Sequence, residues 1–139
     1  MAKYYLGIDL GTKTLGLATS HGIIATSYGV YQFPENDFSN AAQYLITLIG
    51  NKNFTDIVIG YPKNMNNTIG PRAVMVDDFI TLLKSMLLTP IPIHLIDERL
   101  TTRQAHQIML EANLSRQKRK TKKDSLAAQL ILETYLQQQ

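Results

Sequence analysis

The fold is decided by residues 6–18, which read LGIDLGTKTLGLA. Two apolar, β-prone runs flank Gly11, which favours a tight reversal, so this stretch is predicted to form a β-hairpin. Asp9 interrupts the first run at a place where a half-buried strand normally carries an apolar side chain. Gly7 and Gly16 indicate close approach by a ligand or by another backbone segment. An edge-strand Asp with turn glycines is the alternative interpretation of this stretch.

The length and composition of the chain set the classes of protein that it can belong to. Its 139 residues are enough for one ordinary domain, so residues 1–139 are predicted to fold as a single unit. The absence of cysteine excludes disulfides and thiolate metal ligands. No apolar run reaches the roughly 18 residues of a membrane span, and the N-terminus lacks a signal-peptide pattern. We therefore expect a soluble cytoplasmic protein that does not contact the membrane.

Hydrophobic periodicity predicts the strands. After the hairpin, residues 23–33 form a third β-prone run, which makes an antiparallel meander of three strands. Short unbroken apolar runs at residues 56–60 and 91–96 are typical of strands that are covered on both faces. These two strands are predicted to be parallel.

Helical spacing and capping residues predict the helices between and after these strands. Ser39 is a candidate cap for the first helix, and Pro71 suits the first turn of the second. A capping box starting at Thr101 opens a third helix, and residues 122–136 form the last. The order is βββαβαβαα, an α/β fold in which helices cover both faces of a mixed sheet.

Two further carboxylates resemble Asp9 in their positions. Glu98 follows the last predicted strand, at the edge where open α/β sheets place ligands. Asp124 lies on the last helix, three and four residues before Ala127 and Ala128, on the face that packs inward. Taken singly, Glu98 could be a helix-dipole acid and Asp124 part of a capping box.

Taken together, carboxylates from three separate elements at one sheet edge would repel each other unless a cation lay between them. Such repulsion is expected to raise the pKa of at least one of them. Magnesium prefers oxygen ligands and is held by a few carboxylates plus substrate phosphates, the arrangement used in two-metal phosphodiester hydrolysis. No histidine is required, and His94, inside an apolar run, is interpreted as a core residue.

Six of the fourteen basic residues fall between positions 116 and 123. This basic run predicts phosphate binding, because it directly precedes Asp124. It contains no aromatic residue, so base stacking is not its expected role. A solvated charge run is the alternative. Its basic residues are Arg116, Lys118, Arg119, Lys120, Lys122 and Lys123.

Motifs along nearly the whole chain resemble the YqgF family. They read GIDLGTK at residues 7–13, GYP at 60–62 followed by NM at 64–65, DERLTT at 97–102, and DSLAA at 124–128. The family is known as Holliday-junction resolvase and as the nuclease that finishes the 5′ end of pre-16S ribosomal RNA. One departure is that Asn66 and Asn67 stand where the family usually has Asp-Gly.

The resemblance implies an RNase H-like nuclease whose catalytic and metal-binding residues are Asp9, Glu98 and Asp124. It implies Mg²⁺, or Mn²⁺ as a substitute, and nucleic-acid contacts by Lys13, Asn64 and the basic run. The substrate would be precursor rRNA, in ribosome biogenesis, or branched DNA, in recombination and repair. The protein would be a monomer or a homodimer.

Two other interpretations stay open at the level of sequence. Residues 9–14 also resemble the phosphate hairpin of the actin and sugar-kinase superfamily, whose members close two such domains over ATP and need more than this length. A non-catalytic nucleic-acid-binding module would tolerate loss of the carboxylates, which metal-dependent cleavage assays would reveal.

Overall fold

A five-stranded mixed sheet forms the centre of the molecule, with strand order β3-β2-β1-β4-β5. The computed structural model describes residues 2–63, 66, 68–98 and 116–139, with the side chains of 116–124 left out. Neighbouring strands among the first three are antiparallel, whereas β4 is parallel to β1 and β5 to β4, as the sequence predicts. The strands are β1 (Tyr5–Leu10), β2 (Thr14–Ser20), β3 (Thr26–Gln32), β4 (Asp56–Tyr61) and β5 (Ile93–Asp97).

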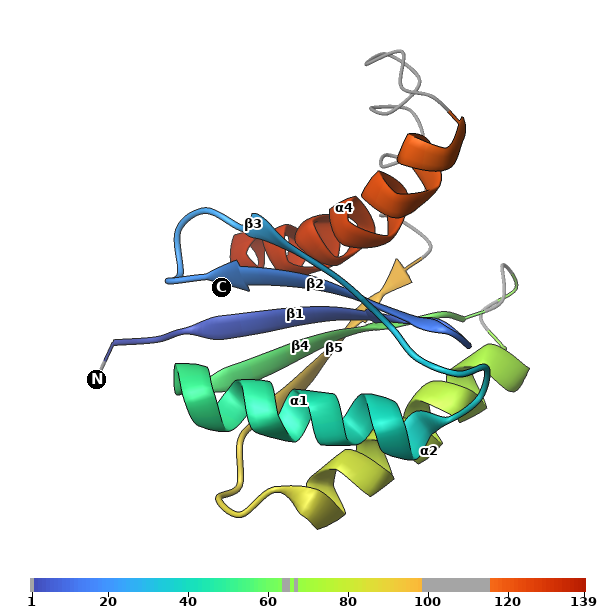
Figure 1. The fold of residues 1–139 in the computed structure, drawn as a ribbon. Coiled ribbons are helices and arrows are strands. Elements are labelled where there is room, and N and C mark those ends of the chain that lie inside the picture. Colours follow the sequence, from blue (N-terminus) through green and yellow to red (C-terminus); the bar gives the residue numbers. More distant parts are fainter. Residues whose placement is uncertain (1, 64–65, 67, 99–115) are drawn as a thin grey trace.

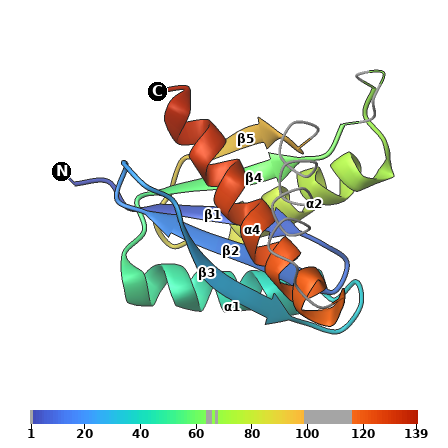
Figure 2. The ribbon, with the colours of Figure 1, turned by 90° about the horizontal axis from the view of Figure 1, so that it is seen from above.

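Helices cover both faces of this sheet. In Figure 1, α1 (Phe38–Lys52) and α2 (Pro71–Met86) lie below the sheet, and α4 (Arg116–Gln137) lies above it. Seen from above in Figure 2, α4 crosses the strands obliquely. None of the described helices is long and apolar enough to cross a membrane.

Alternation along β1 divides its side chains between two hydrophobic clusters. Leu6, Ile8 and Leu10 belong to the larger cluster, which the buried faces of α1 and α2 complete. Tyr5 belongs to the smaller cluster, with residues of α4 such as Ala128. Because successive strand residues point to opposite faces, Gly7 and Asp9 lie on the α4 side with Tyr5.

The glycine in β1 allows α4 to lie close to the sheet, as predicted. A Cβ added at Gly7 would come within 2.9 Å of the Leu132 Cβ and 3.1 Å of the Ala128 carbonyl oxygen. Ala127 and Ala128 are buried at this interface. The strand glycine and the two alanines therefore act together, and a larger residue at any of them would push the helix outward.

The structure corrects several predicted features of the strands and helices. The third strand begins at Thr26, not at residue 23, because its pairing with β2 starts at Thr19 opposite Thr26 and leaves the residues between them to connect the strands. Helix α1 begins at Phe38 and is capped by Asp37, which accepts a hydrogen bond from the Asn40 backbone N–H, so Ser39 is not the cap. Strand β5 is not covered on both faces, since it is only partly buried and Leu95 is 47% exposed.

The last helix is longer than predicted. It begins at Arg116, not near residue 122, so the basic run lies on its first turns. Helix α2 has Pro71 in its first turn, as predicted. The helix predicted to start at Thr101 lies outside the described residues.

Candidate active site

Asp9 lies near the carboxyl end of β1, on the face that α4 covers. Its strand neighbour is Gly16 of β2. Beyond Leu10 the chain turns back at once, and the Gly11 N–H donates to the Thr14 carbonyl at 2.8 Å. This tight hairpin fixes Asp9 at the end of the sheet where the parallel strands β4 and β5 also end.

Glu98 comes directly after β5, and its side chain extends over the neighbouring strand β4. A Cβ built on Gly60 would lie 2.5 Å from Glu98 Oε1 and 2.6 Å from Glu98 Cγ. The same atom would lie 2.6 Å from Ile131 Cδ1 of α4. Gly60 therefore provides the space in which the Glu98 side chain lies between the sheet and the helix.

The Asp9 and Glu98 side chains meet across this space and hydrogen bond to each other. Burial, the hydrogen bond with Asp9 and the negative charge of Asp9 together raise the pKa of Glu98 to about 9, although Arg72 acts in the opposite direction. Two carboxyl groups can share a hydrogen bond only when one holds a proton. The pKa of Glu98 is therefore raised, as predicted for at least one of the carboxylates, and the pair favours holding a proton when no metal is bound.

The backbone of α4 brings Asp124 towards the same end of the sheet. Tyr5 of β1 contacts Tyr135, whereas Gly7 lies against Leu132 and Ala128, so the helix runs antiparallel to β1. Asp124 is one turn before Ala128, in the direction that leads from Gly7 to Asp9. Its side chain is outside the described set, and its part in the site stays a prediction.

The pair of carboxylates has the chemistry of a divalent-cation site. Both side chains offer oxygen ligands, which Mg²⁺ prefers, and a cation between them would take the place of the shared proton. Among the side chains that the structure describes, no group of three or more histidine or acidic residues comes together to hold a metal ion. A three-carboxylate centre therefore needs Asp124 in addition.

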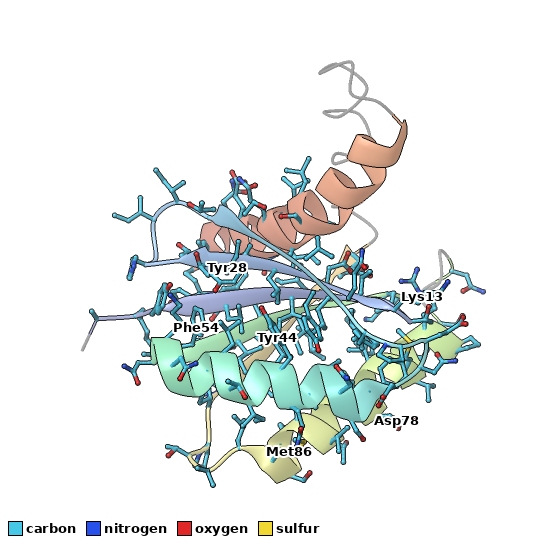
Figure 3. The ribbon with its side chains drawn as sticks, in the orientation of Figure 1. Lys13, Tyr28, Tyr44, Phe54, Asp78 and Met86 are labelled. Atoms are coloured by element: carbon cyan, nitrogen blue, oxygen red, sulfur yellow. The ribbon has the colours of Figure 1, made fainter. Side chains whose placement is uncertain are left out.

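The structure describes some of the residues predicted to contact nucleic acid and not others. Lys13 is exposed in the turn between β1 and β2, beyond Asp9 at the same end of the sheet (Figure 3). The backbone of the basic run forms the first turns of α4. Asn64 lies outside the described residues.

Sequence analysis missed two neighbours of Glu98. Arg72, next to Pro71 at the start of α2, is the positive charge that acts on the Glu98 carboxyl group. Gly60 was interpreted as the end of a strand, although a glycine in such a run also signals close approach. The missing information was spatial, because neither residue is near Glu98 in the sequence.

His94 is not a core residue. Its side chain is 31% exposed and its Nε2 lies 3.0 Å from Asp56 Oδ2, while its ring stacks on Tyr135. The correction follows from the place of β5 at the sheet edge. Asp56 is at the opposite end of the parallel strands from Glu98, so His94 lies away from the candidate site.

The mixed five-stranded sheet with helices on both faces is the RNase H-like fold, as found in RuvC. The described structure superposes on Thermus thermophilus RuvC in complex with a Holliday junction with a TM-score of 0.58, over 98% of this chain and 96% of that chain. The two sequences are only 12% identical, so this similarity concerns the fold.

The family profile described as "RuvX: Holliday junction resolvase" matches residues 3–138, and the chain belongs to this family. A Mesoplasma florum protein named "Putative pre-16S rRNA nuclease" is 50% identical over 95% of this chain and 94% of its own length. Proteins of the same name from Mycoplasma capricolum and Bacillus subtilis are 47% and 41% identical, covering 99% and 94% of this chain. The resemblance to the YqgF family is thereby confirmed.

Proposed function

We propose that this chain is a metal-dependent endonuclease that hydrolyses phosphodiester bonds of precursor 16S rRNA to form its 5′ end. The Asp9–Glu98 pair at the carboxyl edge of the sheet is the observation that carries this proposal. Support for the substrate comes from relatives up to 50% identical that are named as pre-16S rRNA nucleases. This role belongs to ribosome biogenesis in the cytoplasm.

In this proposal Asp9, Glu98 and Asp124 hold Mg²⁺, or Mn²⁺ in its place, through carboxylate oxygens. Bound there, the metal would supply an activated water and would stabilise the leaving oxygen. Glu98 must release its proton before it binds a cation, so metal affinity should rise with pH. Lys13 and the basic run would hold the phosphate backbone by charge, whatever the base sequence.

Resolution of branched DNA is the second candidate function. The family description names Holliday junction resolvase, and the same carboxylates would serve either substrate, because both reactions break a phosphodiester bond. The difference between the two functions must therefore arise from how the substrate is positioned.

A side-by-side cleavage assay tests both functions. Purified protein is given a precursor 16S 5′ segment or a four-way DNA junction of similar length, with Mg²⁺, with Mn²⁺ and with chelator. We expect metal-dependent cleavage of the RNA at a defined position, and much slower cleavage of the junction. Faster cleavage of the junction would favour the resolvase, and no metal-dependent cleavage of either substrate would refute the nuclease proposal. An Asp9→Asn preparation controls for contaminating nucleases.

A further inference from the structure

Two stacked tyrosines line a depression at the outer edge of the sheet, between β3 and α1. The Tyr31 and Tyr44 ring centroids are 3.9 Å apart and the rings are inclined by 11°. Asn40, Gln43 and Thr47 of α1 complete the lining of this open depression of about 300 Å³. It thus combines two aromatic side chains with two carboxamides and a threonine hydroxyl, and none of its lining residues is charged.

The carboxamides offer hydrogen-bonding groups that their neighbours do not use up. The Tyr31 hydroxyl donates to Asn40 Oδ1 at 2.5 Å, which leaves the Asn40 amide N–H groups available as donors. Gln43 is exposed and makes no side-chain hydrogen bond to the described part of the chain. Carboxamides match the paired donors and acceptors on the edges of nucleobases.

A third tyrosine, Tyr28, lies on the same strand as Tyr31. Tyr28 is 44% exposed, and it lies near enough to Tyr44 to contribute, after burial, to raising the pKa of the Tyr44 hydroxyl. The β2–β3 pairing shifts at this point, because Leu17 faces Gly29 while Ala18 faces Ser27, so Tyr28 is the extra residue of a bulge. Bulges redirect side chains.

The depression lies two strands away from Asp9 in the sheet, on the opposite face. Asp9 faces Gly16, and Gly16 faces Val30, the residue before Tyr31. Two strand spacings, about 10 Å, therefore separate the backbone of Asp9 from that of Val30 in β3. The tyrosines pack on the α1 side of the sheet and Asp9 lies on the α4 side. A nucleic-acid strand that passes Asp9 therefore has to bend around the free edge of β3 to reach the tyrosines.

We propose that Tyr31 and Tyr44, with Asn40 and Gln43, bind an unpaired nucleobase of the substrate strand beside the cleavage site. The proposal rests on the proposed nuclease function for the identity of the ligand. Stacking on aromatic rings is how proteins hold single-stranded nucleic acid, and every base has a flat face to stack. A phosphate group would not suit the depression, because no lining side chain is a cation. A base held there would select substrates with a single-stranded segment next to the cut.

Binding measurements with matched oligonucleotides test this site. Anisotropy titrations compare a short single-stranded RNA with a duplex of equal phosphate number, for wild type and for Tyr44→Leu. We expect Tyr44→Leu to weaken binding of the single strand about 5- to 100-fold and to leave duplex binding unchanged. The salt dependence should stay the same, since no phosphate contact is lost. Tyr44→Phe should restore binding, whereas Tyr135→Leu, on the α4 side, controls for loss of a tyrosine elsewhere.

Two further measurements keep the outcome decisive. Melting temperatures identify a variant that fails to fold, in which case Gln43→Ala, at an exposed helix position, replaces it and is expected to weaken single-strand binding severalfold. Wild-type cleavage is measured separately, so an inactive wild type that still binds single strands through Tyr44 would refute the nuclease but not the base site. Equal loss of single-strand and duplex binding, or no loss of either, would overturn the base site.

Discussion

The two ends of the parallel strands each hold a carboxylate against the sheet, and the surroundings shift the pKa values of the two in opposite directions. Asp56, where β4 begins, is only 3% exposed. It accepts hydrogen bonds from Lys3 Nζ at 3.2 Å, from Thr55 Oγ1 at 2.8 Å and from His94 Nε2 at 3.0 Å. Burial alone would raise the pKa of Asp56, but these three donors outweigh burial and lower it.

At the other end, Glu98 is placed against a second acid. Burial and Asp9 raise the pKa of Glu98 to about 9, and Arg72 offsets only part of that effect. The chain thus stabilises the charged form of Asp56 with its own hydrogen-bond donors. It leaves the Asp9–Glu98 pair suited to a cation from outside. The difference separates a carboxylate that stabilises the fold from a pair that is costly to bury and that, in the proposed function, binds the metal.

The largest expected difference between the two ends is in catalysis. Asp9→Asn and Glu98→Gln should each reduce metal-dependent cleavage at least about 100-fold, because each removes a ligand that stabilises charge in the transition state. Nucleic-acid binding should change little, since phosphate contacts dominate it. Asp78→Asn removes an exposed carboxylate of α2 and serves as the charge-matched control. Cleavage by either site variant within about threefold of wild type would exclude the proposed metal site.

The second difference is the response of stability to metal. A cation that binds only the folded protein raises the free energy of unfolding by about 2.7 kcal/mol at a hundredfold excess over its Kd. Asp9→Asn removes the charge that helps to force Glu98 to take up a proton on folding, so the variant should melt above wild type in chelator and gain less from millimolar Mg²⁺ or Mn²⁺. Thermal scans under both conditions measure this. A variant that melts below wild type in chelator and responds fully to metal would make Asp9 a structural residue.

The reverse is expected at the other end of the sheet. Asp56→Asn should lower the free energy of unfolding by about 1–3 kcal/mol at neutral pH, because a buried acceptor loses its charge-assisted hydrogen bonds. Its response to metal should match that of wild type. Urea unfolding with and without Mg²⁺ measures both quantities, and a lost metal response would show that the two ends do not have separate roles.

The smallest expected effect is the pH dependence of the Asp56 contribution. The pKa of Asp56 is lower in the folded protein than its ordinary value of 3.8, so the unfolded chain takes up a proton first as pH falls. The contribution is complete above the ordinary pKa and disappears as pH falls through the folded-state pKa. The stability difference between wild type and Asp56→Asn should therefore be constant near neutral pH and shrink in acid. A difference that persists in acid would mean that packing, not charge, accounts for it.

Much of the candidate site could be predicted because local patterns carry it. Asp9 in an apolar run before Gly11 indicated a carboxylate at the end of a hairpin, and Glu98 just after a strand indicated the same edge. The residues around them could not be predicted in this way. Gly60 and Arg72 reach Glu98 from β4 and α2, through contacts that no sequence spacing encodes.

Errors in the prediction occurred where neighbouring strands, rather than local propensity, set the outcome. Ile23 and Ile24 were assigned to a strand because they are β-prone, yet they are 88% and 73% exposed, because β2 offers them no partner in the register. His94 was assigned to the core from an apolar run that proved to be an edge strand. Exposure of a strand depends on its position in the sheet, which is a property of the whole fold.

The sequence by itself determined the order of the described elements, the hairpin that carries Asp9 and the positions of Asp9 and Glu98 near strand ends. These follow from periodicity and turn residues, which act over a few neighbours in the chain. The tertiary structure decided that Asp9 and Glu98 meet as a hydrogen-bonded pair while Asp56 is surrounded by donors, and that tyrosines of β3 and α1 form one stack. Charge and stacking interactions act between groups a few ångströms apart, and only the folded sheet brings these distant residues that close.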